Sequence, residues 1–186
     1  VLVKSGAGQR SLAAGMMHAL YQELRGKVQA GGASSYHVIF LTDKSYSMTS
    51  GDAAPGQVWC NFGYPNRLGC ALEACDRFVR MRDAAGAMDK ISVVMFDDGS
   101  MPVLRAVDLH AELITDLVRS TKFSYGGTAF NAAFEAAQAI VRRDSEGMPF
   151  LIMFLTDGHD GGCQQRLAMS IDDLCGNPDV SMKALS

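Results

Sequence analysis

The sequence has few cysteines, no long apolar run and no cluster of basic residues, and each absence excludes a class of protein. The five cysteines of the 186-residue chain stand at spacings that match neither a CxxC pair nor a common zinc signature. The longest apolar run, residues 150–155, is far shorter than the roughly 20 residues of a membrane-spanning helix. Lysine and arginine total 17 against 20 for aspartate and glutamate, and they are scattered, which argues against a nucleic-acid partner.

The cysteines also bear on the cellular compartment. Their number is odd, the chain has 11 methionines, and no signal peptide is recognisable. These features predict free thiols in a reducing compartment, so we expect a cytoplasmic protein. The chain starts at Val1, which suggests a fragment, and an extracellular location with a lost leader stays open.

Short apolar runs alternate with helical patterns along most of the chain, which is the order of an open α/β sheet. The preceding residues, 1–35, are expected to form a helix at 9–29 and a linker, and residues 36–186 to form the domain. The expected strands are 38–41, 91–96 and 150–155, with 101–107 returning antiparallel beside the second. A further short run spans 180–185. Helices are expected at 68–82, 109–119, 129–143 and 164–175, and residues 50–66 read as a long loop.

Three polar motifs stand beside these elements: DKSYS at 43–47 after the first strand, GGT at 126–128 before a helix, and TDG at 156–158 after a later strand. In a parallel sheet, the loops at the carboxyl ends of the strands gather in one crevice, where ligands bind. We therefore expect the three motifs to meet.

The donors in these motifs are two carboxylates and three hydroxyls, from Asp43, Ser45, Ser47, Thr128 and Asp157. Hard oxygen donors without histidine or cysteine favour Mg²⁺ or Mn²⁺ over zinc or copper. Two negative charges just neutralise a divalent ion, which then stays electrophilic enough to seek another anionic oxygen. The sequence thus predicts a metal site with an open coordination position.

Taken together, the three motifs resemble the metal-ion-dependent adhesion site of von Willebrand factor type A domains, over roughly residues 36–160. The resemblance implies that Ser45, Ser47 and Thr128 are hydroxyl ligands, and that Asp43 and Asp157 hold the ion directly or through water. In that family the remaining position takes a carboxylate from a partner protein. The resemblance also implies a Rossmann-like, mostly parallel sheet with one antiparallel edge strand and helices on both faces.

Two features depart from the family pattern. Many members have glycine between the two serines, whereas this chain has Tyr46, as integrin β-subunit domains do, and this tyrosine could narrow access to the ion. The family also continues for about two strands after the TDG motif. We therefore expect an incomplete sheet whose exposed edge pairs with missing C-terminal strands or with another protein.

The leading hypothesis is a non-enzymatic binding module that captures an acidic side chain of a protein partner through Mg²⁺ or Mn²⁺. An intracellular scaffold and an adhesion protein are both compatible with it. The alternative from another class is a metal-dependent phosphoryl-transfer enzyme of similar topology. Such an enzyme needs a second carboxylate two residues after Asp43, where this chain has Ser45.

Some residues outside the three motifs are expected to be structural. Asp97 and Asp98 precede Gly99 and are predicted to make a hairpin turn. Trp59, Phe62 and Tyr64, in the expected long loop, are predicted to cover the core.

Overall fold

The computed structural model describes residues 35–121, 123–144, 147–158 and 161–185, the side chains of 183–185 excepted. The helix expected at 9–29 lies outside these ranges, so the division into a preceding segment and a domain stays a prediction.

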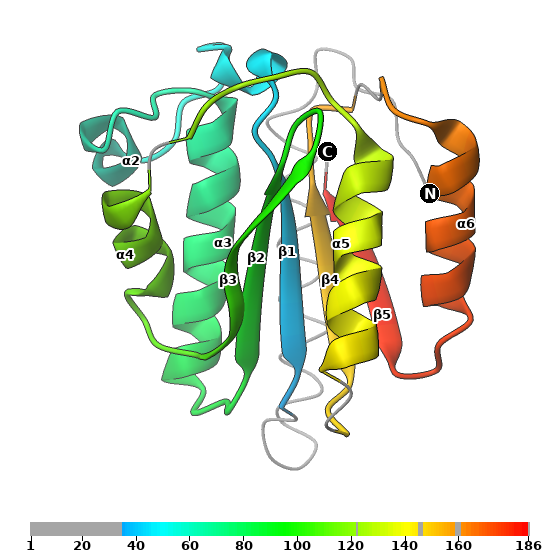
Figure 1. Cartoon of the computed structure of the whole chain (residues 1–186). Helices are drawn as coiled ribbons and strands as arrows, with labels where there is room; N and C mark the ends of the chain where they lie inside the picture. Colours follow the sequence, from blue (N-terminus) through cyan, green and yellow to red (C-terminus); the bar gives the residue numbers. More distant parts are fainter. Residues whose placement is uncertain (1–34, 122, 145–146, 159–160, 186) are drawn as a thin grey trace.

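A five-stranded sheet forms the centre of the molecule, in the order β3-β2-β1-β4-β5 (Figure 1). Strand β3 runs antiparallel to β2, and every other neighbouring pair is parallel. The predicted fold class is therefore confirmed. The strands are β1 (His37–Asp43), β2 (Lys90–Phe96), β3 (Ser100–Asp108), β4 (Phe150–Leu155) and β5 (Val180–Leu185).

The central strands are apolar because helices cover both of their faces. All residues of β1 and β4 are buried, and successive side chains of β1 point into opposite layers. Val38 and Phe40 pack into one core cluster, and Ile39 and Leu41 pack into the other. The continuous apolar runs in the sequence therefore correspond to strands with two buried faces.

Helices cover both faces of the sheet. Helices α3 (Arg67–Ala84) and α4 (Leu113–Ser120) contribute to the first cluster, and α5 (Phe130–Arg143) and α6 (Gln164–Cys175) contribute to the second. Within the described part of the chain, none of the helices combines the length and hydropathy needed to span a bilayer.

The structure differs from the expected elements in two places. Residues 50–66 are not loop throughout, since they contain the helix α2 (Gln57–Asn61), which is too short to show a helical period. Helix α4 begins at Leu113, not at 109, and the amide of Leu109 donates to the carbonyl of Asp89 at 3.1 Å. Trp59 is buried, and Phe62 and Tyr64 pack against the same core, so their covering role is confirmed.

Strand β5 lies at one edge of the sheet and pairs with β4 on its inner side. Among the described residues, no strand pairs with its outer side. The expectation that a further strand or another protein pairs there stays a prediction.

A buried ion pair joins the end of α3 to the start of β2. The Arg82 Nε lies 2.7 Å from Asp89 Oδ2, and its Nη2 lies 2.8 Å from Asp89 Oδ1. The two side chains are 3% and 0% exposed. Asp89 Oδ1 also accepts from the amide of Tyr36 at 2.9 Å, so one carboxylate fastens both the helix and the chain leading into β1.

Candidate metal site

The topology of the sheet explains the position of two of the three polar motifs. Strand β1 lies between β2 and β4. The connection after β1 runs through α3 on one face, and the connection after β4 runs through α6 on the other. Chains that leave neighbouring strands toward opposite faces open a crevice at the carboxyl ends of those strands. The DKSYS and TDG motifs stand at the two sides of this crevice.

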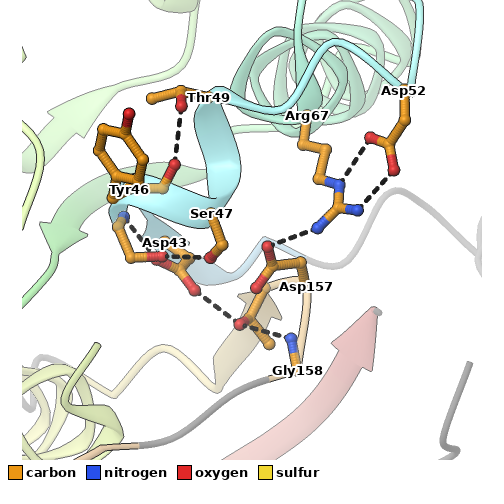
Figure 2. A network of polar contacts seen from close by, with 10 residues as sticks. Asp43, Tyr46, Ser47, Thr49, Asp52, Arg67, Asp157 and Gly158 are labelled. Carbon is orange, nitrogen blue, oxygen red and sulfur yellow. Dashed lines mark hydrogen bonds and ion pairs between the residues drawn. The ribbon is translucent and has the colours of Figure 1, made fainter. Parts of the chain in front are cut away.

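Asp43 is the last residue of β1 and is fully buried. Its Oδ1 accepts from the amide of Ser45 at 2.7 Å, which folds the chain back at the end of the strand. Its Oδ2 accepts from the Thr156 hydroxyl at 2.7 Å, so the carboxylate bridges the ends of β1 and β4 (Figure 2).

The two serines of the DKSYS motif lie together. The hydroxyls of Ser45 and Ser47 are 3.0 Å apart, and the short 3-10 helix η1 (Tyr46–Thr49) turns the chain so that both reach the same side. Ser45 is buried and Ser47 is half-buried. Tyr46 between them is 76% exposed, as a side chain at the rim of a site would be.

Asp157 faces Asp43 from the loop after β4 (Figure 2). Its Oδ2 accepts from Arg67 Nη1 at 2.8 Å. Its Oδ1 is buried and has no hydrogen-bond partner among the described residues. A buried carboxylate oxygen without a partner is costly, and in native proteins it calls for a ligand such as an ion or a water molecule.

Thr128 lies in the loop that faces η1, but no side-chain hydrogen bond within the described residues joins it to the other four candidates. Two residues earlier, the carbonyl of Gly126 accepts from the amide of Tyr46 at 2.8 Å. The structure therefore brings Asp43, Ser45, Ser47 and Asp157 together and places Thr128 in a loop fastened to the same turn.

An acidic turn between β2 and β3 holds this glycine loop, which the sequence did not predict. Asp98 Oδ2 accepts from the amide of Gly127 at 2.8 Å. A Cβ on Gly127 would lie 2.2 Å from Asp98 Oδ1, so a larger residue at this position would have to displace the exposed Asp98 side chain. The expected hairpin turn is also present, since the amide of Gly99 donates to Asp97 Oδ1 at 3.2 Å. The pair of adjacent glycines at 126–127 is the feature of the sequence that could have indicated this contact.

Lys44 does not line the rim of the site. It is buried, it pairs with Asp97, and it donates to the carbonyl of Ser124 at 3.1 Å. Hydrogen bonds and the charge of Lys44 hold the pKa of Asp97 below its usual value although partial burial opposes them. Lys44 thus fastens the strand end to the loop that carries Thr128.

The carboxylates in and beside the crevice differ in how well their charges are compensated. Burial raises the pKa of Asp43 and outweighs its hydrogen bonds with Thr156 and Ser45, and the nearby charge of Asp157 adds to the rise. At the exposed Asp52, a hydrogen bond from Arg67 lowers the pKa of the carboxyl group to about 2. A cation between Asp43 and Asp157 would offset the burial of both carboxylates.

The donors fit a hard divalent ion. The described residues contain no group of three or more His, Cys, Asp or Glu side chains that could hold a metal, so a thiolate or imidazole site is absent from this part of the chain. What the crevice offers is two carboxylates with adjacent hydroxyls, which suits Mg²⁺ or Mn²⁺. Asp157 Oδ1, for which the described ranges offer no hydrogen-bond partner, is available to such an ion.

The chain belongs to the von Willebrand factor type A domain family, whose model matches residues 38–159. This family consists of protein-interaction modules, many of which depend on a metal ion. No curated protein matches the chain.

Solved structures share the fold. An aerotolerance-related membrane protein from Bacteroides fragilis has a TM-score of 0.54 at 21% identity, over 81% of this chain and 66% of that one. The manganese-loaded TRAP protein of Plasmodium vivax has a TM-score of 0.58 at 20% identity, over 81% of this chain and 56% of that one. A von Willebrand factor type A protein from Catenulispora acidiphila has a TM-score of 0.55 at 18% identity, over 82% and 33%. This chain therefore spans from a third to about two thirds of the length of these structures.

Proposed function

We propose that this domain is a divalent-metal-dependent binding module that captures an acidic side chain of a partner protein. The observation that carries the proposal is the buried Oδ1 of Asp157, which has no hydrogen-bond partner in the part of the chain that the structure describes, beside the buried carboxylate of Asp43. The two carboxylates lie at the carboxyl ends of adjacent strands, and one cation bound between them would compensate the charge of both. The TRAP protein of Plasmodium vivax, which shares the fold, is loaded with manganese, and this supports the binding of a divalent ion.

In the proposed site, Asp43, Ser45, Ser47, Thr128 and Asp157 hold the ion, directly or through water. The bound ion supplies a Lewis-acidic position that attracts an anionic oxygen. The chain's own residues fix the geometry: Thr156 and the amide of Ser45 orient Asp43, and Arg67 orients Asp157. Exposed Tyr46 contributes to the rim against which a partner would rest.

We further propose that the domain is not an enzyme and that it acts in the cytoplasm. The position two residues after Asp43 carries Ser45, whose hydroxyl cannot serve as the general acid of a phosphoryl-transfer enzyme with an aspartate nucleophile. The exposed thiols of Cys163 and Cys175 suit a reducing compartment. The phosphoryl-transfer alternative would be supported by turnover of a generic phosphate ester that disappears in Asp43→Asn.

Chelation tests the proposed function. We expect proteins captured from cell lysate on the immobilised chain in buffer that contains Mg²⁺ to be released by EDTA, because the ion forms part of the contact. The Asp43→Asn chain, as a matched control, should fail to capture the same proteins in Mg²⁺. Capture that persists in EDTA and with Asp43→Asn would contradict metal-dependent binding.

A further inference from the structure

Arg67 is held in place beside the candidate metal site by its backbone. It is the first residue of α3, and the preceding Asn66 caps the helix by accepting from the amide of Gly69 at 3.0 Å. The amide of Arg67 donates to the carbonyl of Ser50 at 3.1 Å, just after η1. The helix start is thus fastened to the loop that carries the serines, and the guanidinium is directed toward Asp157 (Figure 2).

The guanidinium joins two carboxylates of different exposure. Its Nη1 lies 2.8 Å from Asp157 Oδ2, on a side chain that is 8% exposed. Its Nε lies 2.8 Å from Asp52 Oδ1 and its Nη2 lies 2.5 Å from Asp52 Oδ2, on a side chain that is 55% exposed. Such a fork geometry fixes the guanidinium more firmly than a single contact does.

The two carboxylate oxygens of Asp157 therefore have different surroundings. Arg67 occupies Oδ2, and the buried Oδ1 is left for another cation. A guanidinium stays protonated at every physiological pH, so its charge cannot be removed by titration. Any ion that binds Asp157 Oδ1 therefore shares a carboxylate with a permanent positive charge.

We propose that Arg67 is a resident cation that sets the affinity of the site for its divalent ion, and that Asp52 moderates this effect. The inference rests on the proposed metal site and adds its regulation. Arg67 weakens metal binding because it repels the ion and draws electron density from a shared ligand. Asp52 strengthens metal binding because it neutralises part of the charge of Arg67.

The two residues touch each other, yet the proposal gives their variants effects of opposite sign. Arg67→Gln keeps an N–H donor for Asp157 and removes the charge, so it should tighten Mg²⁺ binding about tenfold, the change that one charge at close range causes in proton affinity. Asp52→Asn leaves the charge of Arg67 uncompensated and should weaken Mg²⁺ binding about threefold. A purely structural role for the pair would weaken binding in both variants.

Calorimetric titration of the chain with MgCl₂ and with MnCl₂ tests the proposal. Arg67→Lys, which keeps the charge, should stay near the wild-type affinity. Arg77→Gln is the matched control, because Arg77 is an exposed arginine on the same helix that also pairs with a carboxylate, that of Glu73, and the Mg²⁺ affinity of this variant should be unchanged. The shift of the melting temperature on adding Mg²⁺ is the second readout, and it should be larger in Arg67→Gln than in the wild type.

The outcomes separate this inference from the proposed function. Tighter Mg²⁺ binding in Arg67→Gln together with weaker binding in Asp52→Asn supports the inference, and so does a chain that binds Mg²⁺ only after Arg67→Gln, whereas shifts of the reverse sign overturn it. If the wild type binds Mg²⁺ and the two variants match it, or both weaken it, the inference is overturned and the metal site stands. If neither the wild type nor Arg67→Gln binds either ion, both are overturned. Should Arg67→Gln fail to fold, the exposed Asp52→Asn variant decides, since an unchanged affinity there overturns the inference.

Discussion

The Asp43→Asn chain is expected to bind Mg²⁺ at least about 100-fold more weakly than the wild type in calorimetric titration, while staying folded. The substitution removes one of the two negative charges that would hold the ion, and Mg²⁺ depends strongly on carboxylate ligands. Asparagine can still accept from the amide of Ser45 through its oxygen, and its NH₂ group can donate to the Thr156 hydroxyl.

The same variant should be at least as stable as the wild type when no metal is present. Burial raises the pKa of Asp43, so folding favours the protonated form and the ionised carboxylate lowers stability at neutral pH. Asparagine has no charge to bury. A variant that loses metal binding and gains thermal stability would show that this carboxylate is kept for binding and not for the fold.

Asp116→Asn is the matched control for this experiment. Asp116 is an exposed carboxylate on α4 that pairs with Arg119 at 3.1 Å, and its replacement should leave Mg²⁺ affinity unchanged. If Asp43→Asn and Asp116→Asn both bind Mg²⁺ as tightly as the wild type, Asp43 is not a ligand.

The second large effect is expected at the buried ion pair. Arg82→Ala should lower the free energy of unfolding by about 3 to 5 kcal/mol, because it leaves the fully buried Asp89 carboxylate without its counter-charge. Asp89→Ala should cost a similar amount, since it removes the counter-charge of the Arg82 guanidinium and the acceptor of the Tyr36 amide. Urea unfolding followed by circular dichroism measures both.

An exposed pair provides the comparison for Arg82. Arg142 and Asp173 lie 3.3 Å apart, with side chains 66% and 47% exposed, so Arg142→Ala should cost only about 0 to 1 kcal/mol. Losses in the single variants that the double variant Arg82→Met, Asp89→Leu largely recovers would identify the uncompensated charge as the cause. Equal losses for Arg82→Ala and Arg142→Ala would show that burial of the pair does not matter.

The sequence predicted the sheet and its helices well because their signals are local. The run at 150–155 and the helix at 164–175 match the structure to the residue, since an apolar run and a helical period lie within a single element. The position of the first and third motifs in one crevice was also predictable, because strand ends meet in a parallel sheet.

The contacts that tune the site could not be predicted in the same way. Arg67 and Asp157 are 90 residues apart in the sequence. Nothing in the TDG motif identifies this arginine as the partner of Asp157. Arg82 is the last residue of the helix expected at 68–82, but no local pattern identified Asp89 as its counter-charge. Such pairings depend on the tertiary arrangement of the elements, which local propensities do not encode.

A Mn²⁺ site in crystals of this chain is the most direct test of the central claim. Anomalous scattering from crystals grown with MnCl₂ should show one strong peak between Asp43 and Asp157, at about 2.0 to 2.3 Å from the hydroxyls of Ser45 and Ser47. Crystals grown with Mn²⁺ that show no anomalous peak in this crevice would contradict the account.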